Sequence, residues 1–284
     1  MKTHFNKHLY ERGLFLLNFI FVIMMIIIFY FELKLDYFFY TLIVITGLLS
    51  YYFFDKNKTF SKGVVLTNLF VFFYFLYPFI AQFLSQTVPQ ISTYALILYT
   101  LFLAYIFLEF LGKKDKVLNT IKNTKISILL LLIPLSLVSG FIFYSVGEPI
   151  PREAVGVHTS ITSIIISVFV LALLIGISEQ LLFSGFVYNT YKTMTSNLDA
   201  QIQTSILFIA FHMIRIQVLI ESFVLYYFEL AYMFLIIYFL CLFIFMNIAI
   251  KLFEGGKRFK GSLLYSIIFH TITDFTLIML VLFL

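Results

Sequence analysis

The chain has 284 residues, of which 62% are hydrophobic and only 12% are charged, with a formal net charge of +5. Soluble proteins carry about 45–50% apolar and about 25% charged residues, so a water-soluble fold of this composition would have to expose large apolar patches. The composition excludes a soluble enzyme, a disordered chain and a nucleic-acid-binding module, and it indicates membrane lipid as the surrounding partner.

Predominantly apolar runs follow one another along the chain, each long enough to cross a bilayer, which takes about 20 residues. In chain order these nine runs cover residues 13–31, 37–54, 64–86, 91–111, 126–146, 160–188, 200–220, 222–250 and 261–284. We therefore expect an all-α fold, a polytopic membrane helix bundle of about nine transmembrane helices, or eight if one pair is merged. Merging or splitting of a helix, which would change this number, is expected first at the long run 222–250.

Basic residues fall mainly on one side of this arrangement. With the N-terminus in the cytoplasm, 16 of the 19 Lys and Arg residues lie in cytoplasmic segments, and the exceptions are Lys34, Arg152 and Arg215. Basic residues concentrate on the cytoplasmic side of membrane proteins. The distribution predicts a multi-pass plasma-membrane protein with a cytoplasmic N-terminus, and the composition rich in Lys, Phe and Ile favours a bacterial membrane.

Ionisable side chains inside the apolar runs are the candidates for function, because they are costly in a bilayer unless they face a bundle interior or a wet cavity. They are Glu109, Glu179, His212, Arg215, Glu229, His270 and Asp274. Glu109 lies four residues from Lys113, so it can extend to the headgroups. Glu229 lies near the expected outer surface, so we expect it to line an outer vestibule or to bond between helices.

Four of these side chains share one depth. At about 1.5 Å of rise per residue, Glu179, His212 and Asp274 lie roughly 20 Å from the cytoplasmic ends of their helices, and His270 roughly 15 Å. They belong to three separate helices, and His270 and Asp274, four residues apart, share a helix face. Separately satisfied interhelical hydrogen bonds are the alternative, but a common level near mid-membrane favours one shared site.

Three short motifs occur in order on these helices, namely Glu179-Gln180-x-x-x-Ser184, Phe208-x-x-x-His212 and His270-x-x-x-Asp274. With them the sequence resembles the CAAX-protease and bacteriocin-processing family (CPBP, also called Abi) of intramembrane proteases. The motifs of that family are Glu-Glu-x-x-x-Arg, Phe-x-x-x-His and His-x-x-x-Asn or Asp. The resemblance implies a protease core in residues 126–284, preceded by a four-helix membrane region of unknown role in residues 1–125.

The first motif departs from the family pattern at two positions. The family's second Glu and its Arg are four residues apart and form a helical ion pair, whereas Gln180 and Ser184 stand here. Losing one partner would leave a buried charge at a cost of about 3–5 kcal/mol, but replacing both by neutral groups can be nearly neutral. The pair is therefore interpreted as exchanged as a unit. Alternatively, Arg215 supplies the positive charge, although an Arg at the outer interface is the simpler interpretation.

The resemblance implies that Glu179 and His212 activate a water for attack on a peptide carbonyl, while His270 and Asp274 position that carbonyl or stabilise its oxyanion. The supporting residues would be Gln180, Ser184, Phe208 and Arg215. The expected substrate is a peptide or protein in or at the membrane, such as a leader, pheromone or bacteriocin precursor, and no cofactor is expected.

Two alternatives remain open at this point. Glu179, His212 and His270 could bind zinc, since three such ligands and a water form a catalytic zinc site, but no His-Glu-x-x-His motif is present and we favour metal-independent hydrolysis. The departures at Gln180 and Ser184 favour a catalytically inactive membrane scaffold or a bacteriocin self-immunity protein. A proton-coupled transporter would be expected to show internal repeats with broken helices, which the sequence lacks.

Overall fold

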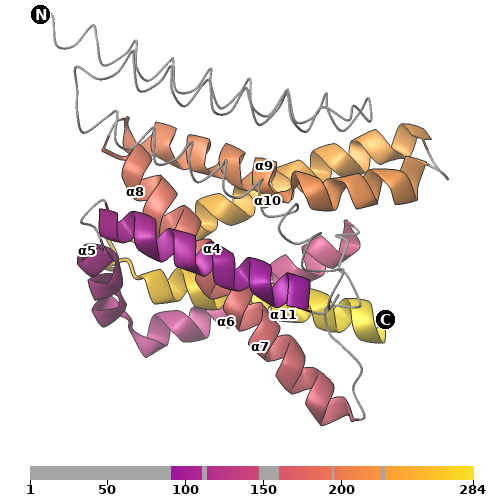
Figure 1. The fold of residues 1–284 in the computed structure, drawn as a ribbon, viewed down its shortest axis with the longest axis horizontal. Coiled ribbons are helices and arrows are strands. Elements are labelled where there is room, and N and C mark those ends of the chain that lie inside the picture. Colours follow the sequence, from indigo (N-terminus) through magenta and orange to yellow (C-terminus); the bar gives the residue numbers. More distant parts are fainter. Residues whose placement is uncertain (1–90, 111–113, 147–159, 194, 225–227) are drawn as a thin grey trace, which may run out of the picture.

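The structure, a computed structural model, describes residues 91–110, 114–146, 160–193, 195–224 and 228–284. This part of the chain is almost entirely helical (Figure 1), with one isolated bridge between Gly255 and Lys260 and no named strand. Four of its helical stretches are long and apolar enough to cross a membrane: Ile126–Ser145, Ile161–Tyr191, Met233–Glu254 and Leu263–Phe283. The described residues thus have the expected all-helical, membrane-protein character. The three runs before residue 90 lie outside them, so the total of nine stays a prediction.

Most of the long helices begin close to the start of a predicted apolar run. They are α4 (Ile91–Phe110), α5 (Lys114–Asn119), η1 (Thr120–Asn123), α6 (Ile126–Ser145), α7 (Ile161–Gln180), the π-helical η3 (Leu181–Val187), α8 (Tyr188–Tyr191), α9 (Asn197–Val224), α10 (Phe228–Glu254) and α11 (Leu263–Phe283). The predicted run 222–250 is wrong at its start, because Ser222 belongs to α9 and α10 begins at Phe228. The described residues of α4 and α9 are not among the four candidate spans, so their predicted crossing of the membrane stays a prediction.

Serine caps fix where two of the site-bearing helices begin. Ser160 precedes α7 and its side chain accepts a hydrogen bond from the Ser163 amide, while Ser262 does the same for the Leu264 amide at the start of α11. An N-cap serine satisfies one of the backbone N–H groups that the first turn leaves without an intrahelical acceptor. The two helices therefore start at defined residues, which sets the register of every side chain further along them.

Helix α11 lies at the centre of the described bundle and packs against α6, α7 and α10. On one side, a Cβ atom added to Gly140 of α6 would lie 2.7 Å from the Thr273 carbonyl oxygen. Small residues allow this close backbone approach, which is a principal source of helix association in lipid. Helices α9 and α10 run side by side (Figure 1), and α4 packs across α7 and η3.

A polar junction joins three helices at the end of α10. Glu254 accepts hydrogen bonds from Lys192 Nζ at 2.6 Å, Asn197 Nδ2 at 3.2 Å and Gln201 Nε2 at 3.1 Å. The chain then reverses through Gly255, whose φ of 81° lies in the left-handed region that glycine adopts without strain. These hydrogen bonds hold the end of α10 against the start of α9 and against Lys192, which directly follows α8.

Candidate functional site

The structure brings the carboxylate and the two imidazoles together around one oxygen atom. Glu179 Oε2 of α7 lies 3.8 Å from His212 Nε2 of α9 and 3.7 Å from His270 Nε2 of α11. Asp274 Oδ2, one turn along α11, lies 3.4 Å from His270 Nε2. The first three side chains are buried and that of Asp274 is 17% exposed. Four side chains that the sequence placed at one depth therefore form a single cluster.

The backbone of α9 determines how His212 faces this cluster. His212 Nδ1 lies 2.9 Å from the Phe208 carbonyl oxygen. A carbonyl oxygen only accepts, so Nδ1 donates its hydrogen, and in the neutral ring Nε2 then carries the lone pair. The lone pair is therefore on the side of Glu179. The Phe208 ring packs 4.3 Å from the imidazole, centroid to centroid, as the four-residue spacing predicts.

On its other edge, His270 contacts the part of the first motif that departs from the family pattern. Gln180 Nε2 lies 2.9 Å from His270 Nδ1, and Ser184 Oγ lies 2.7 Å from Gln180 Oε1. Both Gln180 and Ser184 are fully buried. The two expected neighbours therefore do contact each other, but the sequence analysis did not foresee that Gln180 also reaches His270 on a different helix.

The helix that carries Glu179 and Gln180 changes its hydrogen-bonding pattern directly after them. Residues Leu181–Val187 are π-helical, and all of them are buried. Single π-helical turns inside α-helices are rare and often occur at functional sites. Ser184 lies within this segment, so the altered pattern helps to set the position from which its hydroxyl contacts Gln180. No feature of the sequence signalled it.

Aromatic rings enclose the two imidazoles. The Phe245 ring of α10 meets His270 edge-on at 4.9 Å and stacks on Phe269 at 5.0 Å, and Phe183 meets Phe208 edge-on at 5.0 Å. Electrostatic interactions are stronger in such apolar surroundings than in water. Phe245 was missed by the sequence analysis because nothing distinguishes it among the 38 Phe of the chain.

Of the three remaining candidates the structure describes the side chain of Glu109 alone, and it does not join the cluster. Glu109 of α4 is exposed and forms an ion pair with Lys114, and the hydrogen bond that Lys114 donates to Glu109 raises the pKa of that lysine above its ordinary value. Glu109 thus has a charged partner near the helix end. The side chains of Arg215 and Glu229 lie outside the described residues.

The zinc alternative finds no support among the described side chains. Among them, no three His, Cys, Asp or Glu side chains are placed so that they could hold a metal ion. We therefore derive no chemical step through a metal.

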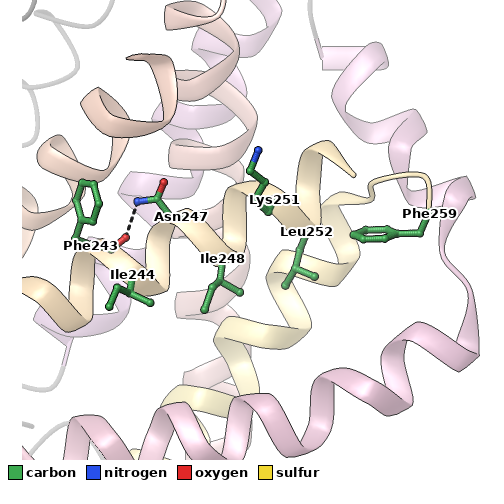
Figure 2. A pocket seen from close by; sticks show the side chains of 7 residues that line it. All are labelled: Phe243, Ile244, Asn247, Ile248, Lys251, Leu252 and Phe259. Atoms are coloured by element: carbon green, nitrogen blue, oxygen red, sulfur yellow. Dashed lines mark hydrogen bonds between the residues drawn. The ribbon is translucent and has the colours of Figure 1, made fainter. Parts of the chain in front are cut away.

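An open surface groove of about 410 Å³ lies along α10, away from the cluster (Figure 2). It is lined by Phe243, Ile244, Asn247, Ile248, Lys251, Leu252 and Phe259. The Asn247 amide donates to the Phe243 carbonyl oxygen, as Figure 2 shows, and to Ser205 Oγ of α9. Lys251 is the one titratable residue of this lining. The groove therefore lacks the acid and base groups that peptide hydrolysis requires.

Comparisons of the chain with models of protein families, with curated proteins and with solved structures find no match. The resemblance to the CPBP family therefore rests on the three motifs.

Proposed function

We propose that this chain is an intramembrane endopeptidase of the CAAX and bacteriocin-processing type. It hydrolyses a peptide bond of a membrane-associated peptide or protein without a cofactor. The observation that carries this proposal is the buried Glu179 carboxylate, whose Oε2 lies within 3.8 Å of imidazoles from two other helices. Buried ionisable groups are costly in membrane helices and usually serve function. The distribution of basic residues supports a cytoplasmic N-terminus, and the composition rich in Lys, Phe and Ile supports a bacterial plasma membrane.

Glu179 and His212 act together on the attacking water. A separation of 3.8 Å between Glu179 Oε2 and His212 Nε2 exceeds a direct hydrogen bond, yet one water can lie within hydrogen-bond distance of both atoms. Glu179 accepts a proton from this water as its oxygen bonds to the peptide carbonyl carbon, and the His212 lone pair orients the water. The same proton then passes to the amide nitrogen as the C–N bond breaks, leaving a carboxylic acid and an amine.

His270 and Asp274 act on the carbonyl oxygen. In the tetrahedral intermediate that oxygen carries a negative charge, which a fixed N–H donor in an apolar site stabilises strongly. Asp274 Oδ2, 3.4 Å from His270 Nε2, orients the ring before the substrate carbonyl replaces this contact. The aromatic rings of Phe208 and Phe245 exclude bulk water from the two imidazoles and hold them in place.

The noncatalytic alternative depended on the uncharged residues in the first motif. Gln180 and Ser184 are buried, hydrogen bonded to each other and in contact with His270. Buried polar groups are paired in any stable fold, but here the pairing reaches His270 of the cluster itself. Their arrangement supports an intact site, and we favour the enzyme over a scaffold or an immunity protein.

The proposal is tested in cells that naturally express the chain. The chromosomal gene is changed to encode Glu179→Gln or His212→Ala, and new peptide termini in the membrane fraction are compared by mass spectrometry. Glu109→Gln is the matched control, because it makes the same chemical change at an exposed glutamate. We expect one set of termini to disappear in both site variants and to persist in the control. Identical termini in all strains, at equal protein levels, would exclude proteolysis.

A further inference from the structure

We infer that Gln180 and Ser184 form a relay that fixes the tautomer of His270, so that this ring presents an Nε2–H group to the reaction. This assigns a positioning role to the two residues at which the chain departs from the family motif. The inference rests on the proposed function for its catalytic meaning. The proton position itself can be measured without any substrate.

The relay begins at the serine hydroxyl. Ser184 Oγ lies 2.7 Å from Gln180 Oε1, and both side chains are fully buried. An amide oxygen carries no hydrogen, so the hydroxyl is the donor in this contact. A hydroxyl can also accept, so this contact agrees with the amide orientation of the structure without selecting it; in that orientation the NH₂ group faces the opposite side, where His270 lies.

The second step passes this orientation to the imidazole. Gln180 Nε2 lies 2.9 Å from His270 Nδ1. An amide NH₂ group donates and does not accept, so Nδ1 must offer its lone pair. A neutral imidazole carries one N–H, and its place is set by the hydrogen bond that the other nitrogen makes. The hydrogen of His270 is therefore on Nε2.

The groups on the opposite edge of the ring agree with this assignment. His270 Nε2 faces two carboxylate oxygens, Glu179 Oε2 at 3.7 Å and Asp274 Oδ2 at 3.4 Å. Ionised carboxylates only accept hydrogen bonds. With the hydrogen on Nδ1, the ring would direct a lone pair towards both acids and would also meet the NH₂ group of Gln180 with a second donor. Both edges of His270 thus select the same tautomer.

The two imidazoles of the cluster consequently have opposite tautomers. His212 donates from Nδ1 to the Phe208 carbonyl and turns a lone pair towards Glu179, whereas His270 turns an N–H towards the same carboxylate. A lone pair suits the ring that orients water, and an N–H suits the ring that stabilises an oxyanion. A backbone carbonyl sets the first state, and the Gln180–Ser184 relay sets the second.

Substitution at residue 180 can reverse the relay. A carboxylate in Gln180→Glu would accept from Nδ1–H, so the hydrogen of His270 would be found on Nδ1. Gln180→Leu removes the donor and leaves no preference from this side. Ser184→Ala removes the group that orients the amide, so both tautomers of His270 become populated. His212 does not contact the relay and should keep Nδ1–H in every variant.

The test is nuclear magnetic resonance of the full chain in lipid nanodiscs, with ¹⁵N in the rings of its five histidines. The His270 signals are those that disappear in His270→Gln, and correlations between ring carbon-bound hydrogens and ring nitrogens show which nitrogen is protonated. At neutral pH we expect a hydrogen on Nε2 in the wild type, on Nδ1 in Gln180→Glu, and a mixture in Ser184→Ala. The wild-type spectrum decides the question even where a variant does not fold.

A wild-type His270 protonated on Nδ1, or a tautomer that does not change in folded Gln180→Glu and Ser184→Ala, would overturn the relay. Its failure is separable from that of the proposed function. Glu179-dependent cleavage with Nδ1–H on His270 would remove the relay alone. Nε2–H on His270 together with unchanged cleavage in Glu179→Gln would remove the protease alone.

Discussion

Gly176 of α7 lies against Thr271 of α11 so closely that an added Cβ atom would be 2.6 Å from Thr271 Oγ1 and 3.2 Å from the Ile267 carbonyl oxygen. Glu179 follows Gly176 by three residues, and His270 directly precedes Thr271. The crossing of the two helices is therefore adjacent to the contact between the carboxylate and the imidazole. The absence of a side chain at residue 176 allows the contact to form.

Gly176→Ala should separate α7 from α11 and lower stability. The added methyl group meets backbone and a buried hydroxyl that cannot move far, and overpacking of this kind costs about 1–3 kcal/mol. Denaturant-induced unfolding in detergent measures the loss. Gly256→Ala is the control, because a Cβ there would meet nothing within 4 Å. Gly176→Ala combined with Thr271→Ala should recover part of the loss. Equal stability of Gly176→Ala and the control would show that the close approach is not required.

Glu254 should contribute more to the free energy of unfolding than a single exposed ion pair does. Its carboxylate accepts from Lys192, Asn197 and Gln201, and hydrogen bonds to charged groups contribute about 1.5–3 kcal/mol each when buried. The site is partly exposed, so we expect Glu254→Ala to cost about 2 kcal/mol in total, measured by unfolding.

Lys251→Ala provides the comparison for Glu254→Ala. Lys251 Nζ lies 3.9 Å from the same carboxylate and its side chain is 62% exposed, and exposed pairs contribute about 0–1 kcal/mol. We expect no measurable change for this variant. A loss for Lys251→Ala as large as that for Glu254→Ala would show that net charge, rather than the hydrogen-bonded junction, stabilises this end of the bundle.

The sequence predicted those parts of the fold that depend on apolar length. The runs at 91–111, 126–146 and 261–284 correspond to α4, α6 and α11, because a bilayer or an apolar core requires long uninterrupted apolar helices. The sequence prediction placed Ser222 in the wrong helix. The residues around the end of α9 and the start of α10 are similarly apolar, so composition alone did not indicate where one helix ends and the next begins. The π-helical turn Leu181–Val187 was not predictable, since its apolar residues suit an ordinary α-helix equally well.

For the candidate site, depth and spacing identified the residues but not their contacts. Equal depth predicts that Glu179, His212 and His270 share one site, and the structure places both imidazole Nε2 atoms within 3.8 Å of Glu179 Oε2. The contact from Gln180 to His270 depends on the rotation of α7 about its own axis relative to α11. Helix rotation is set by packing at residues such as Gly176, and periodicity within one helix carries no information about it.

Asp274 should be replaceable by a neutral acceptor but not by an apolar side chain. Asp274 Oδ2 lies 3.4 Å from His270 Nε2, and an amide oxygen could take the same place as a neutral acceptor. We expect Asp274→Asn to keep peptide hydrolysis within about tenfold of the wild-type rate and Asp274→Leu to lose about 10²-fold or more. Initial cleavage rates of the two purified variants provide the measurement. Equal losses in both would show that the charge of Asp274 is required.

Metal chelators should leave hydrolysis unchanged. A search of the described part of the chain finds no group of three acid, thiol or imidazole side chains that could hold a metal, and the proposed steps use Glu179, the two imidazoles and Asp274. The purified protein in liposomes is treated with 1,10-phenanthroline, its rate is measured, and its metal content is determined by mass spectrometry. Loss of activity that zinc restores, with about one zinc per chain, would contradict metal-independent hydrolysis.

The central claim is that Glu179 activates water for peptide hydrolysis, and isotope incorporation tests it most directly. Purified full-length protein in liposomes is incubated in H₂¹⁸O with peptides from the membrane fraction of its own cells, and new carboxyl termini are analysed by mass spectrometry. We predict one ¹⁸O in each new carboxylate for the wild type and for Glu109→Gln. In Glu179→Gln the rate should fall by about 10²–10⁴-fold, as expected when a general base is lost. Labelled termini that form at the wild-type rate in folded Glu179→Gln would contradict the account.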